Sequence, residues 1–429
     1  MEIIPIHHPL DGTVRVPGSK SLTNRALLIS ALSSGKTRLI NALFSDDSCY
    51  FAKALQTLGF DIELDEPTLE MTVTGLDGKI PVKKADLFIG NSGTTARFLS
   101  AFLTLGHGEF IVDGEPRMRE RPIGDLVSAL AQLGANIEVS SSDCPPVKIK
   151  ASGLEGGKTS IAGNISSQFL SALLMVAPYA RSPVEIEVIS ELNSKPYIDM
   201  TLAIMHDFGV EVKRNDHQYF SIPLATYHLP GTNLQSPISS YTIESDASAA
   251  SYFFAAPAIC GGTVRVENIS RHSKQGDVAF LDVLAQMGCR IKERENDIEV
   301  TGSQSLIGVD VNMCDIPDTA QTLAVIAPFA STPTRIRGIA SARVKETDRV
   351  HATCTELARL GVRVEEHSDG MTIYPCEKFT PSTIQTYNDH RMAMAFSLIG
   401  LRVPGVMIED PSCVSKTFPN YFNVLETLR

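Results

Sequence analysis

The chain has 429 residues, of which 43% are apolar and 20% charged, and its mean hydropathy is +0.03. These values are typical of a water-soluble globular protein with more than one domain. The formal net charge of −11 disfavours general nucleic-acid binding, because a phosphate backbone needs a broad basic surface. No apolar run reaches the roughly 20 residues that span a bilayer, and the start of the chain lacks the regions of a signal peptide. We therefore expect a cytoplasmic protein that binds neither membranes nor nucleic acid.

Eight cysteines are spread singly along the chain, and none forms a Cys-x-x-Cys pair. Cys260, Cys289 and Cys354 lie within apolar stretches. This pattern favours small core side chains over a disulfide framework or a zinc site.

One pattern recurs along the chain. Five times an amphipathic helical segment ends in an apolar residue and a glycine, and alternation typical of a strand follows at once. The segments are 51–64, 125–139, 199–212, 277–291 and 347–364, and their glycines are Gly59, Gly134, Gly209, Gly288 and Gly361. Successive glycines are 75, 75, 79 and 73 residues apart. Residues 421–428 resemble a sixth such helix. The spacing is too long for a solenoid repeat and indicates six small α/β modules, each with two helices and several strands.

A segment rich in Pro, Gly, Ser and Thr, 227–245, interrupts the repeat and predicts a crossover between two domains. A strand is expected near 14–16, and the pattern alone leaves open which half it joins.

Basic residues in polar clusters precede several apolar helical runs. Lys20 and Arg25 lie at the start of one run, Arg97 precedes a second, and His390 and Arg391 precede a third. Cations near a helix N-terminus oppose the helix dipole, at a cost of some tenths of a kcal/mol each. Small polar neighbours leave backbone N–H groups accessible there, and amides together with cations suit phosphate or carboxylate. We therefore predict a small polyanionic ligand.

Four polar clusters also have a plainer interpretation, and the sequence leaves each one open. The plainer interpretations are an N-cap for Asn388 and Asp389, a solvated loop for Arg117, Arg119 and Arg121, a helix start for 166–168, and a surface row of ion pairs for 343–349.

Motifs for several other chemistries are missing from the sequence. Ser34-Gly35-Lys36-Thr37 mimics the end of a P-loop, but Ser30 stands where the first glycine is required. The chain has no Gly-x-Gly-x-x-Gly, His-Glu-x-x-His or Gly-x-Ser-x-Gly. Nucleotide-binding, zinc-protease and hydrolase-elbow chemistry are therefore disfavoured.

The polar clusters, in this order, closely resemble the 5-enolpyruvylshikimate-3-phosphate synthase family, from about residue 16 to Lys416-Thr417-Phe418-Pro419. The resemblance implies a two-domain α/β enolpyruvyl-transferase fold of six repeated βαβαββ-type modules, three per domain around a pseudo-threefold axis. Residues 1–18 with 241–429 would form one discontinuous domain, and 19–240 the inserted one. The resemblance also implies a monomer without metal or cofactor and a target for glyphosate. Because the basic clusters come from both halves of the chain, we expect the domains to close over the substrates.

The family's site residues carry over onto matching positions of this chain. Lys20, Ser21 and Arg25 resemble the first substrate-binding segment. The expected contacts to shikimate 3-phosphate are Ser166, Ser167, Gln168, Ser194 and Tyr197; those to phosphoenolpyruvate are Gly93, Arg121, Arg349, Arg391 and Lys416, with Asn91 nearby; Lys345 and His390 complete the substrate-binding set.

The resemblance implies transfer of the enolpyruvyl group of phosphoenolpyruvate to the 5-hydroxyl of shikimate 3-phosphate, a step of chorismate and aromatic amino acid biosynthesis. The hydroxyl must lose a proton while C3 of the enol gains one, and the resulting tetrahedral intermediate expels phosphate. Asp318 is the expected base towards the hydroxyl, and Glu346, with Lys20, is expected to handle the C3 proton. The chain departs from the enterobacterial branch at Ser341-Ala342, where that branch has Asn-Trp, and at Phe98, where it has Pro.

Three rival functions fit the sequence less well. UDP-N-acetylglucosamine enolpyruvyl transferases share the fold and the donor but carry a cysteine in the loop that corresponds to 113–122, which has none here. Relatives of RNA 3′-phosphate cyclase need a nucleotide and a basic surface. A phosphometabolite-binding protein without catalysis would gain nothing from Asp318 and Glu346 beside its phosphates.

Overall fold

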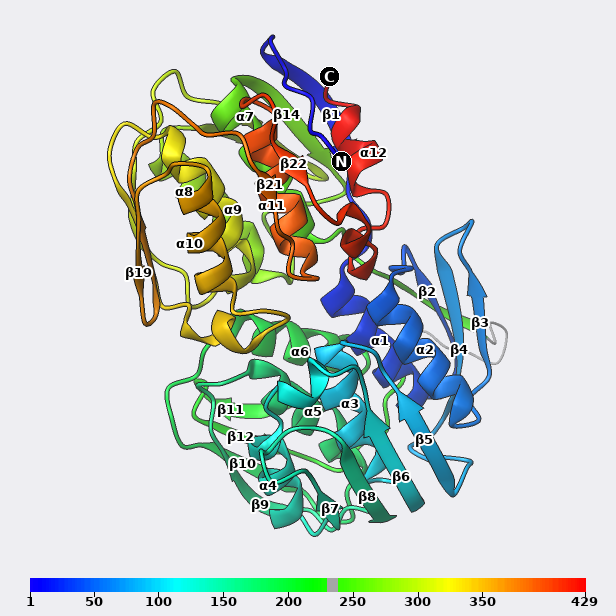
Figure 1. Cartoon of the computed structure of the whole chain (residues 1–429). Helices are drawn as coiled ribbons and strands as arrows, with labels where there is room; N and C mark the ends of the chain where they lie inside the picture. Colours follow the sequence, from blue (N-terminus) through cyan, green and yellow to red (C-terminus); the bar gives the residue numbers. More distant parts are fainter. Residues whose placement is uncertain (230–237) are drawn as a thin grey trace. The chain divides into compact units, whose positions relative to one another are not determined.

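The computed structural model describes residues 1–229 and 238–429, and the chain divides into two compact units (Figure 1). Unit 1 comprises Met1–Pro17 and Glu244–Arg429, and unit 2 comprises Gly18–Ile243. These boundaries differ by one and three residues from those expected after residues 18 and 240. The predicted crossover includes residues 230–237, which lie outside the described residues.

The strands of both units are short. Unit 2 contains β2 (Ser34–Ile40), β3 (Ile62–Asp65), β4 (Glu70–Leu76), β5 (Lys84–Phe88), β6 (His107–Asp113), β7 (Ile137–Glu138), β8 (Val147–Ser152), β9 (Gly157–Ile161), β10 (Val184–Val188), β11 (Lys213–Asn215), β12 (Tyr219–Ile222) and β13 (Ile238–Thr242). Unit 1 contains β1 (Leu10–Arg15), β14 (Gly262–Glu267), β15 (Arg290–Glu293), β16 (Asp297–Thr301), β17 (Asp310–Asn312), β18 (Thr334–Arg337), β19 (Val364–His367), β20 (Gly370–Ile373), β21 (Thr383–Ile384) and β22 (Met407–Ile408).

One topology recurs in all five four-stranded sheets that the described residues form. A parallel pair is extended on one side by two antiparallel strands, as in β5-β6-β8-β7, where only β5 and β6 run parallel. The other sheets are β13-β2-β4-β3, β9-β10-β12-β11, β1-β14-β16-β15 and β17-β18-β20-β19. The pair β21-β22 has only the parallel part. Because β1 pairs with β14, the strand whose partner the sequence left open belongs to unit 1.

The helices fall into two alternating series. Nearly every residue is buried in α1 (Lys20–Leu32), α3 (Gly93–Leu103), α5 (Ser167–Val176), α7 (Ala247–Cys260), α9 (Ala320–Ile326) and α11 (His390–Gly400). Only one face is buried in α2 (Asp46–Thr57), α4 (Gly124–Gln132), α6 (Lys195–Asp207), α8 (Phe280–Gln286), α10 (Arg349–Arg359) and α12 (Tyr421–Glu426). A helix that is apolar all round belongs inside a core, whereas an amphipathic one covers it. Each unit has its own apolar core.

The predicted helix–glycine–strand pattern is confirmed at all five places. Gly59, Gly134, Gly209, Gly288 and Gly361 have φ of 91°, 91°, 80°, 101° and 81°. Each follows a helix of the amphipathic series and precedes β3, β7, β11, β15 or β19. Glycine ends these helices because it enters the left-handed region without the penalty of a Cβ. The predicted sixth helix is α12.

Two smaller predictions are also confirmed. The P-loop mimic at 34–37 forms part of strand β2 rather than a loop before a helix. Cys260, Cys289 and Cys354 are buried, and all eight cysteines are free thiols. Among the described residues, no helix is long and apolar enough to cross a membrane.

Candidate active site

In unit 2, the first turns of several helices come together. Gln168 of α5 donates its side-chain amide to Thr94 of α3 at 3.2 Å. Arg25 of α1 donates to the backbone carbonyls of Ser21 and of Tyr197, which lie in the first turns of α1 and α6. Helix N-termini present unpaired backbone N–H groups and the positive end of the helix dipole. This convergence therefore favours an anionic ligand.

Arg25 is the central cation of this group and is only 2% exposed. Its Nε donates to Thr201 Oγ1 at 2.7 Å, and Nη2 donates to Ser171 Oγ at 3.1 Å. The Phe98 ring lies under the guanidinium, 5.4 Å from centroid to Cζ. All four hydrogen bonds of Arg25 go to uncharged oxygens, and burial lowers the pKa of Arg25 to about 10. A buried cation held only by neutral groups is well suited to an incoming phosphate.

A second arginine, Arg121, follows a 3-10 turn at Met118–Glu120 and is 5% exposed. Its Nη1 donates to the backbone and side-chain oxygens of Asn91 at 2.9 and 3.0 Å. Gly93 begins α3 beside it, and a Cβ there would lie 2.4 Å from Arg121 Nη2 and 3.0 Å from Arg97 Nη1. Glycine at this position therefore leaves room for two guanidinium groups.

The sequence left open whether Arg117, Arg119 and Arg121 form a solvated loop or part of an anion site, and the structure gives a different answer for different arginines. Arg117 pairs with Glu120 at 2.8 Å, and Arg119 pairs with Asp113 at 2.5 Å. Both side chains are substantially exposed, at 34% and 55%. The solvated-loop interpretation is therefore right for these two and wrong for the buried Arg121.

The remaining expected residues of unit 2 lie at helix starts. Lys20 opens α1, and its Nζ lies 3.5 Å from an oxygen of the buried Asp47. Ser166 caps α5 by accepting from the backbone N of Gln168, and Ser167 is the first residue of that helix. Ser194 precedes α6 with a left-handed φ of 58°. The helix-start interpretation of 166–168 is thus correct, and it coexists with their place beside α3.

In unit 1, three cations meet at one carboxylate. Asp318 lies in a 3-10 turn, Pro317–Thr319, before α9. Its Oδ1 accepts from Lys345 Nζ at 2.7 Å and from Arg349 Nη1 at 3.2 Å. Its Oδ2 accepts from Arg391 Nη2 at 2.7 Å. The sequence placed these residues in one site, and the structure brings them together around Asp318.

Arg349 connects this carboxylate to two others. Its Nη2 donates to Glu346 Oε2 at 2.7 Å, and its Nε donates to Asp389 Oδ2 at 2.7 Å. Burial acts to lower the pKa of Arg349, but the carboxylates of Asp389, Glu346 and Asp318 outweigh it and the net shift is upward. With an exposure of 3%, Arg349 does not belong to the surface ion-pair row that 343–349 also suggested. Burial lowers the pKa of Lys345, although Asp318 opposes that shift.

Three further residues of the expected site lie in unit 1. His390 is fully buried, with Nδ1 3.5 Å from Asp389 Oδ1. Arg391 also donates to the hydroxyl of Tyr252 at 3.4 Å. Lys416 ends a 3-10 turn, Pro411–Lys416, which packs against α11.

Sequence reasoning missed several residues that hold the cations. Asp389 was assigned only as an N-cap, and it does cap α11 by accepting from Arg391 N at 2.9 Å, but it also holds Arg349. Ser171 and Thr201, which hold Arg25, are 146 and 176 residues from it along the chain. No local signal identifies such partners.

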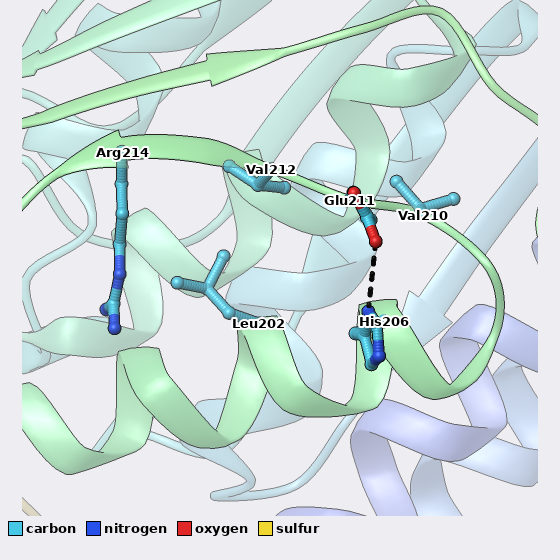
Figure 2. A pocket seen from close by; sticks show the side chains of 6 residues that line it. All are labelled: Leu202, His206, Val210, Glu211, Val212 and Arg214. Atoms are coloured by element: carbon cyan, nitrogen blue, oxygen red, sulfur yellow. Dashed lines mark ion pairs between the residues drawn. The ribbon is translucent and has the colours of Figure 1, made fainter.

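A surface hollow of about 250 Å³ in unit 2 contains none of the expected site residues. It is lined by Leu202, His206, Val210, Glu211, Val212 and Arg214 (Figure 2). His206 and Glu211 form a solvated ion pair of 3.8 Å, with side chains 68% and 83% exposed. The described residues include no group of three or more His, Cys, Asp or Glu side chains arranged to hold a metal ion.

The fold and these clusters define a class of protein: a two-unit α/β protein that gathers buried cations and carboxylates at helix starts to handle small anionic molecules. Comparison with known proteins makes the class specific. A family model described as EPSP synthase (3-phosphoshikimate 1-carboxyvinyltransferase) matches residues 4–425. The chain therefore belongs to the EPSP synthase family.

Individual relatives agree with this assignment. A 3-phosphoshikimate 1-carboxyvinyltransferase of Nostoc punctiforme is 51% identical over 423 residues, covering 98% of this chain and 97% of that protein. A chloroplastic 3-phosphoshikimate 1-carboxyvinyltransferase of Nicotiana tabacum is 49% identical, covering 97% and 82%. The solved structure of the EPSP synthase of Acinetobacter baumannii superposes with a TM-score of 0.81 at 25% identity, covering 100% and 97%.

Proposed function

We propose that this chain transfers the enolpyruvyl group of phosphoenolpyruvate to the 5-hydroxyl of shikimate 3-phosphate and releases phosphate. The observation that carries the proposal is that a member of this family holds Asp318 and Glu346 in one network with three cations, in which Glu346, Arg349 and Arg391 are buried. A protein that only bound anions would place cations there without the carboxylates.

Shikimate 3-phosphate is assigned chiefly to unit 2. The hydrogen-bond partners of Arg25 are all uncharged oxygens. A phosphate can therefore form a charge-assisted hydrogen bond with Arg25 without displacing a carboxylate. The other residues assigned to this substrate are Lys20, Ser21, Ser166, Ser167, Gln168, Ser194 and Tyr197.

Phosphoenolpyruvate is assigned to cations of both units. Gly93 keeps space beside the guanidinium of Arg121 in unit 2, and Lys345, Arg349 and Arg391 are gathered in unit 1. The remaining residues assigned to this substrate are Asn91, His390 and Lys416. Inhibition by glyphosate stays a prediction.

The proposed chemistry places a carboxylate at each proton transfer. An anionic substrate that binds Lys345 and Arg391 competes with Asp318 for them, and this competition frees an Asp318 oxygen to take the proton of the 5-hydroxyl. The hydroxyl oxygen bonds to C2 of phosphoenolpyruvate while C3 receives a proton, which Glu346 and Lys20 are proposed to handle. The tetrahedral intermediate then loses phosphate from C2 and a proton from C3. Neighbouring cations stabilise the charge that develops.

Phosphate release from purified protein tests this function. The protein is mixed with phosphoenolpyruvate and shikimate 3-phosphate, and in parallel with phosphoenolpyruvate and UDP-N-acetylglucosamine. Release with shikimate 3-phosphate alone is expected. Release only with the sugar nucleotide would assign the other enolpyruvyl transferase activity, and no release with either acceptor would leave an anion-binding protein.

The proposal extends to the state of the protein in the cell. We infer a cytoplasmic monomer that needs neither metal nor organic cofactor and binds neither nucleic acid nor membrane. The family resemblance supports the monomer and the absence of a cofactor, and the charge and hydropathy of the chain support the rest. Sedimentation equilibrium with and without both substrates checks the monomer, and turnover after exhaustive treatment with a chelator checks the absence of a metal requirement.

A further inference from the structure

A buried carboxylate outside the predicted site is bound to the loop that carries Asp389. Glu356 lies on α10, seven residues after Arg349, and is fully buried. Its oxygens accept from Arg359 Nη1 at 3.0 and 2.9 Å, from the backbone N of Gln385 at 3.1 Å and from the hydroxyl of Tyr387 at 2.8 Å. A buried carboxylate is costly unless it is paired and hydrogen-bonded. The donors from Arg359, Gln385 and Tyr387 meet this requirement, and two of them belong to the loop before Asp389.

The loop held by Glu356 has an unfavourable backbone conformation. Tyr387 and Asn388 have φ of 54° and 52°, so two consecutive residues other than glycine adopt the left-handed region. Such conformations cost free energy and persist only where surrounding contacts enforce them. Burial and the bond to Glu356 raise the pKa of Tyr387 to about 12, which keeps its hydroxyl protonated as a donor.

The strained residues lead directly into the site. Asp389 follows them, donates its backbone N to the carbonyl of Thr386 at 2.9 Å, and binds Arg349 through both carboxylate oxygens, at 2.7 and 3.2 Å. Helix α10 therefore holds this loop at two points, Arg349 at Asp389 and Glu356 at Gln385 and Tyr387. Residues seven apart lie on one face of a helix, roughly 10 Å from each other along its axis.

We propose that Glu356 is a positioning residue: it holds the loop 385–389 in its left-handed conformation, so that Asp389 orients Arg349 towards Asp318 and Glu346. The proposal rests on the function proposed above and assigns Glu356 no contact with substrate. A misplacement of about 1 Å in such a group can cost about 100-fold in rate.

The test is the variant Glu356→Gln, which keeps the volume of the side chain but offers only one oxygen to donors that now engage two. We expect kcat to fall by about ten- to 100-fold and KM for phosphoenolpyruvate to rise, while KM for shikimate 3-phosphate stays near the wild-type value. This split follows because Arg349 is assigned to phosphoenolpyruvate and Arg25, in the other unit, to shikimate 3-phosphate.

Glu365→Gln is the matched control. Glu365 also accepts from an arginine and a tyrosine, Arg363 and Tyr374, both at 2.9 Å, but it is exposed on β19 and does not contact the loop. Its turnover should equal that of the wild type, whose activity also establishes the function on which the proposal rests.

Tyr387→Phe is the second variant and removes only one of the two loop contacts. It should lower kcat and raise KM for phosphoenolpyruvate by less than Glu356→Gln does. The double variant Glu356→Gln with Tyr387→Phe should lose less activity than the sum of the two single losses, because both residues act through one loop. The proposal is wrong if Glu356→Gln and Tyr387→Phe lower the melting temperature yet leave kcat and both KM values unchanged. It is also wrong if the two KM values rise together. If Glu356→Gln does not fold, the same split measured in Tyr387→Phe decides the matter.

Discussion

The two units hold their most deeply buried arginines, Arg25 and Arg349, by opposite means. In unit 2, the guanidinium of Arg25 is bound by hydroxyls and carbonyls, and Arg121 donates to the oxygens of Asn91. In unit 1, Lys345, Arg349 and Arg391 donate to carboxylates of Asp318, Glu346 and Asp389. Burial lowers the pKa of Arg25 to about 10, whereas nearby carboxylates outweigh burial for Arg349 and raise its pKa.

This difference separates two tasks. A cation with neutral partners costs stability when buried, and that cost is recovered when an anion binds. A cation balanced by carboxylates is stable without ligand, and its carboxylates are freed for proton transfer when a substrate anion competes for the cation. We therefore assign recognition of the shikimate phosphate to unit 2, and the proton transfers chiefly to unit 1.

The largest expected effect on turnover comes from replacing Asp318, the carboxylate to which three cations donate. Asp318→Asn keeps the shape of the side chain but removes the proton acceptor, so kcat should fall by about 10²- to 10⁴-fold. Steady-state phosphate release measures it, and Asp315→Asn, at an exposed position three residues earlier, is the control. Near-wild-type turnover by Asp318→Asn would remove this residue from the mechanism.

Stability should separate the two arginines most clearly. Arg349→Met leaves buried carboxylates without their partner and should lower the free energy of unfolding by about 3–5 kcal/mol. Arg25→Met removes a buried charge, while Ser171 and Thr201 keep their mutual bond of 2.9 Å, so stability should be unchanged or higher. Denaturation followed by circular dichroism compares the two variants. Equal losses would contradict the distinction between the units.

An intermediate effect is expected from Gly93→Ala. The new Cβ would meet Arg121 Nη2 at 2.4 Å, so the guanidinium must move away from α3. We expect KM for phosphoenolpyruvate to rise by about tenfold, equivalent to about 1.4 kcal/mol, with little change in KM for shikimate 3-phosphate. Combining this change with Arg121→Lys should give less than the sum of both effects. Fully additive losses would mean that Gly93 acts through something other than Arg121.

The smallest effect concerns pH. Burial lowers the pKa of Lys345 in the folded protein, so its ammonium is lost at lower pH than in the unfolded chain. Its destabilising contribution is fully present below the folded pKa and is relieved as pH rises towards the unfolded value. Activity is expected to fall as pH rises through that window, because the Lys345 ammonium assigned to phosphoenolpyruvate is lost. Lys345→Arg should therefore shift the alkaline limb of kcat/KM for phosphoenolpyruvate to higher pH, measured from about pH 7 to about pH 11. An unmoved limb would show that another group sets it.

The sequence predicted much of this architecture because its signals are local. Glycines such as Gly59 and Gly361 ended the amphipathic helices as expected, with φ of 91° and 81°. The family resemblance, and no local cluster, placed Asp318 and Arg349 in one site.

What the sequence could not predict depends on distant contacts. Arg117 and Arg121 stand in one loop on either side of a 3-10 turn, but Arg121 is buried whereas the Arg117 side chain is 34% exposed. The local sequence of Asp389 predicts a helix cap. A carboxylate that only caps a helix and one that also binds an arginine have the same local sequence, so the bond to Arg349 could not be predicted. Glu356 gave no signal, because its role arises from bonds to residues 29 and 31 positions away.

Binding of shikimate 3-phosphate alone tests the division between the units most directly. Calorimetric titration would compare the wild type with Arg25→Met and Asp318→Asn in the absence of phosphoenolpyruvate. The account predicts that Arg25→Met loses about 2–5 kcal/mol of binding free energy, while Asp318→Asn binds with affinity close to that of the wild type. Wild-type affinity in Arg25→Met, or an equal loss in Asp318→Asn, would contradict it.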